Sequence, residues 1–95
     1  MIESFRDTRT SAVFRGEMPK GFPSDNIAAV ARRKLRMLDT AARLDDLRVP
    51  PSNRLEALAG DRKGQHSIRV NDQWRLCFVW RDGAAHEVEM VDYHV

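Results

Sequence analysis

The chain has 95 residues, of which 42% are hydrophobic and 32% are charged, and its formal net charge is +2. These values predict one small globular domain spanning residues 1–95, with a modest core and no room for a second domain. No stretch is apolar enough for a membrane span or a signal peptide, and the single Cys77 excludes an internal disulfide. We therefore expect a protein that stays in a reducing cytoplasm.

The N-terminal residues predict a short strand followed by a short helix. Residues 2–6 can form the strand. Asp7 or Thr8 can cap the helix, because a short polar side chain accepts a hydrogen bond from the free amides of the first turn. Gly16 marks its end.

A longer helix is predicted after the proline-containing loop at residues 17–23. Ser24 or Asp25 can cap this helix, and its apolar residues recur every three or four positions, which is typical of a helix with one buried face. These apolar positions are Ile27, Val30, Ala31, Leu35, Leu38 and Ala42. The opposite face carries the cations Arg32, Arg33, Arg36 and Arg43.

The last third of the chain predicts three strands joined by short turns. Residues 65–70 alternate between apolar and polar side chains, and residues 74–94 form a hairpin whose two-residue turn is Asp82 and Gly83. One face of the hairpin carries the large side chains Trp74, Leu76, Phe78 and Trp80. We therefore predict an α+β fold, with the N-terminal strand and two helices packed on a largely antiparallel sheet that ends in a β-hairpin.

The hairpin also predicts where polar groups meet. Counting outward from the turn places Arg75 opposite Met90 and one diagonal step from Asp92 on the same face. Tyr93 and His94 follow directly. A guanidinium, a carboxylate, a phenol and an imidazole are thus expected in one small region.

These groups suit the cleavage of RNA by its own 2′-hydroxyl, which requires charge neutralisation at phosphorus and proton transfer to and from oxygen. Cations that can hold the phosphate or the RNA backbone are Arg62, Lys63, Arg69 and Arg75. Groups that can exchange a proton are Asp92 and His94, while Tyr93 can donate one or stack on a base. One cysteine and three histidines without ligand spacing predict no metal site, and no cofactor motif is present.

The same residues resemble a known family. The run RLEALAGDRKGQHSIRVNDQWRLCFVWRDG at 54–83, the ending VDYH at 91–94 and the opening IESF at 2–5 look like the HigB, or plasmid-maintenance killer, branch of the RelE/ParE toxin superfamily. The resemblance covers nearly the whole chain. It implies a RelE-like fold and a bacterial type II toxin, a ribosome-dependent endoribonuclease that cuts translated mRNA.

The resemblance also implies partners and roles. The partner would be a HigA-like antitoxin with a helix-turn-helix fold, and operator DNA would be bound only through the toxin-antitoxin complex. Two surfaces are alternatives for contact with the antitoxin: the basic face of the longer helix and the active cleft. The catalytic group would be Arg75, Asp92, Tyr93 and His94, and the basic turn for RNA would be Arg62 and Lys63.

Two positions depart from the family pattern. Members often carry a histidine and a lysine where this chain has Glu56 and Ala59. Glu56 can act as a base, with an ordinary pKa of about 4.3, and the missing cation at Ala59 would weaken phosphate binding. A weak or unusually ribosome-dependent nuclease is therefore expected. The competing class is a binding protein, either a ParE-like gyrase inhibitor or a degenerate toxin that acts as co-repressor, but Tyr93 and His94 beside Arg75 favour the enzyme.

Overall fold

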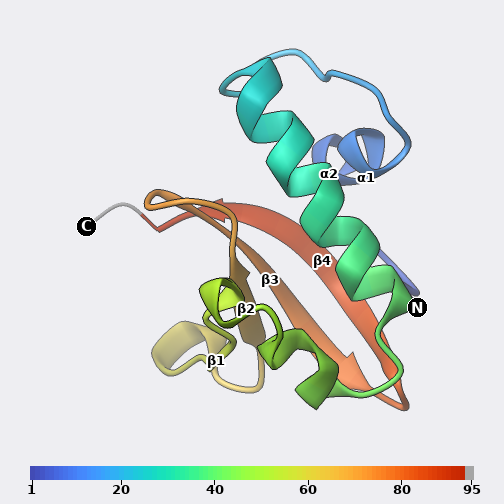
Figure 1. Cartoon of the computed structure of the whole chain (residues 1–95), viewed down its shortest axis with the longest axis vertical. Helices are drawn as coiled ribbons and strands as arrows, with labels where there is room; N and C mark the ends of the chain where they lie inside the picture. The colour runs from blue at the N-terminus through green and yellow to red at the C-terminus, as the bar shows by residue number, and fades with distance from the viewer. Residues whose placement is uncertain (94–95) are drawn as a thin grey trace.

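The structure, a computed structural model, describes residues 1–93 and consists of two α-helices packed on one face of a four-stranded sheet (Figure 1). The helices are α1 (Thr8–Phe14) and α2 (Asp25–Thr40). The strands are β1 (Glu56–Ala57), β2 (His66–Arg69), β3 (Trp74–Arg81) and β4 (Ala84–Asp92). Short 3₁₀ helices at Leu44–Arg48, Pro51–Asn53 and Gly60–Arg62 connect these elements. Within the described residues, no helix combines the length and apolarity needed to cross a membrane.

Both helices begin where the sequence predicts. The Asp7 side chain accepts a 2.7 Å hydrogen bond from the Thr10 amide, and the Ser24 hydroxyl accepts a 3.1 Å bond from the Ile27 amide. Each cap satisfies an amide that has no partner inside its helix. The apolar stripe of α2 then buries Ala28, Ala31, Leu35 and Leu38. The helix ends at Thr40, so the predicted extension through Ala42 and Arg43 is wrong.

The sheet has the strand order β1-β2-β3-β4, and every neighbouring pair is antiparallel. Asp82 and Gly83 join β3 to β4 with φ of 54° and 74°, so the predicted two-residue turn is confirmed. Residues 2–6 run alongside β4 and form only isolated parallel bridges, from Ile2 to Ala85 and from Phe5 to Val88, in place of the predicted strand.

The register predicted for the hairpin is confirmed near the turn, where Arg81 pairs with Ala84, but from Cys77 onward it is wrong by one residue. Cys77 pairs with Glu89, but Val79 pairs with His86, so β4 carries an extra residue between these pairs. Glu87 has φ of 52° at this irregularity, as in a β-bulge. Arg75 therefore lies opposite Val91 and not opposite Met90. Because side chains alternate along a strand, the bulge decides which residues of β4 share the face of Arg75.

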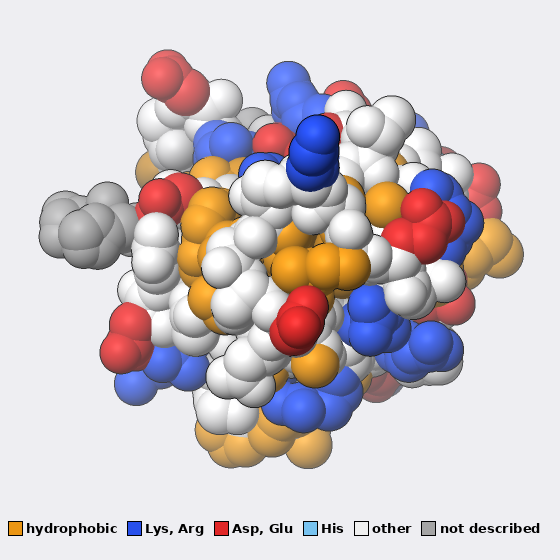
Figure 2. Space-filling model, turned by 90° about the horizontal axis from the view of Figure 1, so that it is seen from above, with side chains coloured by type: hydrophobic (Ala, Val, Ile, Leu, Met, Phe, Trp, Pro, Cys, Tyr) orange, Lys and Arg blue, Asp and Glu red, His pale blue; other side chains and the backbone are white. Residues whose placement is uncertain are grey.

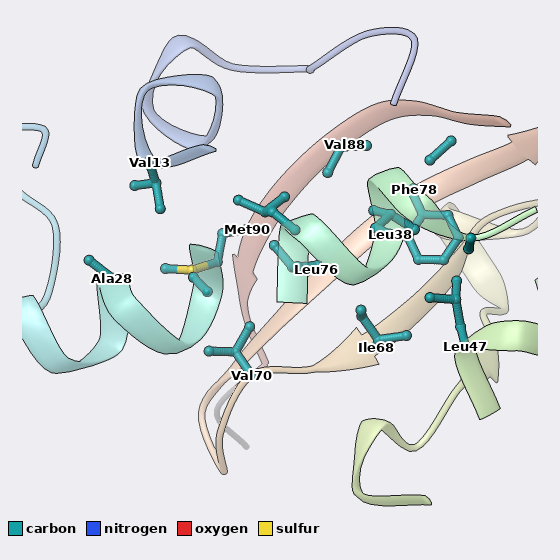
Figure 3. Packing of buried hydrophobic residues seen from close by; sticks show 14 of the residues in the cluster. Val13, Ala28, Leu38, Leu47, Ile68, Val70, Leu76, Phe78, Val88 and Met90 are labelled. Atoms are coloured by element: carbon teal, nitrogen blue, oxygen red, sulfur yellow. The ribbon is translucent and has the colours of Figure 1, made fainter. Parts of the chain in front are cut away.

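The core lies between the helices and the sheet (Figure 3). Leu38 of α2 lies beside Phe78 of β3 in Figure 3, and Val13 of α1, Leu76 of β3 and Met90 of β4 are buried in the same cluster. The predicted packing face of β3 is thus confirmed, with Trp74 and Trp80 packed at its margins. The opposite face of the sheet carries the polar side chains considered next.

Candidate active site

A cavity of about 360 Å³ lies on the face of the sheet that the helices do not cover. Arg75 and Arg69 project to this face because their chain neighbours, Leu76 and Ile68, are buried in the core. The cavity is lined by Arg54, Glu56, Arg69, Asn71, Asp72, Arg75 and Tyr93. Four residues predicted for the site, Glu56, Arg69, Arg75 and Tyr93, are therefore brought together.

Arg75 is the most firmly held cation of this cavity. Its Nε donates a 2.7 Å hydrogen bond to the Ser67 hydroxyl, and its Nη2 donates a 2.6 Å bond to the Arg54 carbonyl. Nη1 makes no hydrogen bond to any residue from 1 to 93. The side chain is only 12% exposed. A guanidinium that lines a cavity and is fixed through two of its nitrogens is suited to bind an oxyanion.

A second cation stands directly across the strand pair, since Arg69 is the Cα partner of Arg75. Like charges in this position repel each other, so the pair costs stability and concentrates positive charge on the cavity. Arg69 is balanced locally by an ion pair with the exposed Asp72. Arg54 adds a third guanidinium to the lining.

Glu56 and Tyr93 supply the groups that can exchange protons or stack. Glu56 lies on β1 opposite Ser67, and its Oε2 is 4.0 Å from Nη2 of Arg75. Its side chain is 58% exposed, so the carboxylate is open to a ligand. Tyr93 follows β4, and its amide donates a 2.6 Å hydrogen bond to the Gln73 carbonyl.

The predicted placement of Asp92 on the face of Arg75 is wrong. Asp92 pairs with Trp74, whose side chain packs against the core, so it belongs to the opposite face. Its Oδ2 accepts a 3.1 Å hydrogen bond from Gln73. The bulge near Glu87 causes this exchange, since one extra residue turns every later side chain of β4 over. His94, the remaining predicted catalytic residue, lies outside the described residues.

The two residues of the predicted RNA-binding turn, Arg62 and Lys63, have different surroundings in the structure. Arg62 lines a second cavity, where its Nη1 donates hydrogen bonds to Gln65 at 3.0 Å and to Glu89 at 3.1 Å. Desolvation lowers the pKa of Arg62, but the Glu89 hydrogen bond raises it, and the resulting pKa lies above its ordinary value. Lys63 is exposed and lines neither cavity.

Sequence reasoning did not identify the two residues that anchor Arg75. Ser67 is fully buried, although it shares the polar face of β2 with Arg69. The one feature of the sequence that could have indicated its role is a small hydroxyl on a strand face that carries arginines. Arg54 acts through its backbone carbonyl and adopts φ of 46°, which no pattern in the sequence indicates. Cys77 lies on the same face, and burial raises the pKa of its thiol to about 11 against the opposing charge of Arg62. A thiol with this pKa is a poor nucleophile at neutral pH.

The face of the molecule in Figure 2 is not dominated by charge of one sign. On the face in Figure 2, cationic and acidic side chains are interspersed with apolar ones. The cavity around Arg75 instead combines three arginines with the two carboxylates of Glu56 and Asp72. Such a site can bind a phosphodiester and transfer a proton next to it.

Comparison with known proteins places this geometry in a family. A family model described as the HigB-like, RelE-like toxin of type II toxin-antitoxin systems matches residues 3–94. Toxin HigB-1 of Vibrio cholerae is 58% identical over 85 residues, which is 90% of either chain. Endoribonuclease HigB of Proteus vulgaris is 32% identical over 94 residues, covering 99% of this chain and 100% of that protein.

The fold has solved counterparts as well. A chain of the YoeB-YefM complex from Staphylococcus aureus matches with a TM-score of 0.62 and 14% identity, covering 100% of this chain and 99% of that one. At this identity the likeness establishes the shared fold. Taken with the match over residues 3–94 and the 58% identity, it leads to one conclusion: the chain belongs to the HigB-like family of RelE-type toxins of type II toxin-antitoxin systems.

Proposed function

We propose that this toxin is an endoribonuclease that cuts translated mRNA on the bacterial ribosome in the cytoplasm. The observation that carries the proposal is Arg75, a nearly buried guanidinium that is anchored by Ser67 and Arg54 and lines an open cavity. A relative named Endoribonuclease HigB supports it. The reaction is the attack of a 2′-hydroxyl on the adjacent phosphorus, followed by departure of the 5′-oxygen.

The residues of the cavity take different parts in this reaction. Arg75 binds the non-bridging phosphate oxygens, and its charge stabilises the transition state more than the ground state. Glu56 accepts the proton of the 2′-hydroxyl, because its exposed carboxylate lies 4.0 Å from the arginine that holds the phosphate. Tyr93 stacks on a base or protonates the leaving oxygen. His94 remains a candidate for proton transfer, as the resemblance implies, whereas Asp92 lies on the other face of the sheet.

The departures at Glu56 and Ala59 set the expected strength of the enzyme. A glutamate is a weaker base than a histidine at neutral pH, and alanine adds no charge to the phosphate site. Arg69 and Arg54, which line the same cavity, supply positive charge from other positions. We therefore propose a slow nuclease that depends on the ribosome to position its substrate.

An antitoxin is the partner that this family implies, and we propose a HigA-like helix-turn-helix protein that brings operator DNA to the complex. Two surfaces are candidates for the contact with this antitoxin, the basic face of α2 and the Arg75 cavity. On α2, Arg33 and Arg36 are exposed, whereas Arg32 is committed to the carbonyls of Val13 and Glu17. The experiment is to reverse the charges of Arg33 and Arg36 and to measure the affinity for the antitoxin. If that affinity does not change, the antitoxin covers the Arg75 cavity instead.

Primer extension on cellular mRNA after toxin induction tests the nuclease directly. The wild type should produce cuts that follow the reading frame, and Arg75→Ala and His94→Ala should abolish them. Arg48→Ala, an exposed arginine away from the cavity, is the matched control and should cut like the wild type. Growth arrest by the wild type without any codon-linked cut contradicts the proposal, and gyrase-linked DNA damage would identify a binding toxin.

A further inference from the structure

A second cavity of about 350 Å³ lies beside the first and has no part in the mechanism above. It is built from three separate segments: the N-terminal segment, the 3₁₀ helix before β2, and β4. Its lining consists of Arg6, Asp61, Arg62, Gln65 and Glu89.

Glu89 is the centre of this cavity. Its side chain is 16% exposed, and its Oε2 is 3.1 Å from Nη1 of Arg62 and 3.6 Å from Nε of Arg6. Both of these contacts are made to Oε2, and Oε1 accepts no hydrogen bond within residues 1–93. The ion pairs therefore fix the carboxylate and leave one acceptor oxygen for a ligand.

The charges of the cavity decide which kind of ligand fits. Arg6 and Arg62 are matched by Asp61 and Glu89, whereas the Arg75 cavity has more arginines than carboxylates. A phosphate would meet the Glu89 carboxylate and be repelled by it. A neutral group with hydrogen-bond donors and acceptors on one edge would not be repelled by Glu89. If this group is a planar ring, it can also stack on the planar guanidiniums of the cavity.

The position of the cavity relates it to the proposed reaction centre. Arg75 pairs with Val91, and Glu89 lies two residues from Val91 on the same strand and the same face. With strands about 4.8 Å apart and a rise of about 3.3 Å per residue, the Cα atoms of Arg75 and Glu89 are roughly 8 Å apart. This spacing suits neighbouring nucleotides of one strand.

We propose that the second cavity binds the base of a nucleotide next to the scissile phosphate, through the hydrogen-bonding edge of that base. Oε1 of Glu89 accepts from a ring or amino N–H, and Arg6, which is half exposed, donates to the neighbouring acceptor of the base. The inference rests on the proposed endoribonuclease function, because it assigns a base-reading role beside that reaction centre.

A binding experiment that needs no cleavage tests this assignment. The isotope-labelled toxin is titrated by NMR with each of the four ribonucleosides and, separately, with inorganic phosphate. At least one nucleoside should shift the amide signals of Gln65 and Glu89, and phosphate should shift those around Arg75 instead. Glu89→Gln should abolish the nucleoside effect, and Glu3→Gln, an exposed control, should retain it. A phosphate response at Gln65 and Glu89, or no nucleoside response there, overturns the inference.

Cleavage on programmed ribosomes provides the second arm. Glu89→Gln and Arg6→Gln, each verified as folded by circular dichroism, should change the preference for one nucleotide beside the cut by about tenfold. Unchanged preference at every flanking position contradicts the base site while leaving the nuclease intact. If the wild type does not cut at all, the proposed function fails, and the nucleoside titration still decides whether the cavity binds bases.

Discussion

Nζ of Lys34 donates a 2.5 Å hydrogen bond to Oδ1 of Asn53, and both side chains are buried. Asn53 also donates to the Leu47 carbonyl at 3.1 Å, so it ties α2 to the two 3₁₀ helices that follow. The next residue, Arg54, has left-handed backbone and presents its carbonyl to Arg75. A buried lysine on the helix side thus positions the proposed phosphate-binding arginine on the opposite face.

Asn53→Ala should therefore affect both stability and cleavage. It leaves the Lys34 ammonium buried without its acceptor, which should cost about 1–3 kcal/mol of unfolding free energy. Cleavage per folded molecule should fall about tenfold, because the Arg54 carbonyl loses its support. Urea unfolding and ribosomal cleavage measure the two effects. Asn26→Ala, an exposed asparagine of α2, should leave both unchanged, and full activity of folded Asn53→Ala would contradict the link.

Ser67→Ala tests the other anchor of Arg75. The change removes the 2.7 Å hydrogen bond to Nε and leaves that donor without its partner. We expect a loss of about 1–3 kcal/mol in stability and a fall in kcat of about tenfold with little change in KM. The exposed Ser52→Ala is the control. A folded variant with wild-type kcat would show that Nε needs no anchor.

Arg69→Gln should raise the stability of the protein while it weakens RNA binding. Removing one of two opposed arginines relieves repulsion, so the unfolding free energy should rise by about 0.5 kcal/mol. RNA binding should weaken and become less dependent on salt, since one phosphate contact is lost. Arg36→Gln on α2 should change neither property. Thermal unfolding and binding measured over a salt series check this, and lower stability with unchanged RNA affinity would contradict it.

Cys77 makes stability depend on pH in alkaline solution. Its pKa is about 11 in the folded protein, above the ordinary 9.0, so the unfolded chain loses the thiol proton first. Between about pH 9 and 11 the unfolded state binds fewer protons, and stability falls as pH rises, by roughly 2–3 kcal/mol in total. The difference between wild type and Cys77→Ala should shrink over this range in urea unfolding. Parallel curves for the two proteins would contradict the assignment.

Local rules predicted the parts of the fold that depend on neighbouring residues. The caps at Asp7 and Ser24 satisfy amides within three residues, and Asp82 and Gly83 turn the chain by their own tolerance of positive φ. The core face of β3 followed from alternation alone. Each of these features is decided by a short segment and needs no knowledge of distant contacts.

The site depended on features that are not local. The extra residue near Glu87 lies where β4 pairs with both β3 and the N-terminal segment, and it moved Asp92 away from the face of Arg75. β1 has two exposed residues, too few for a periodic pattern, so Glu56 was placed by resemblance alone. The anchors of Arg75 are a buried hydroxyl and a backbone carbonyl from separate segments, which only the assembled sheet brings together.

Arg75→Lys provides the most direct test of the central claim, that a fixed guanidinium in this cavity stabilises the cleaved phosphate. Lysine keeps the charge but cannot bond Ser67, Arg54 and a phosphate in one planar arrangement. The measurement is single-turnover mRNA cleavage on programmed ribosomes by purified wild type and variant. The account predicts a fall in rate of about 100-fold with the folded state retained. A folded Arg75→Lys variant that cuts at the wild-type rate would contradict it.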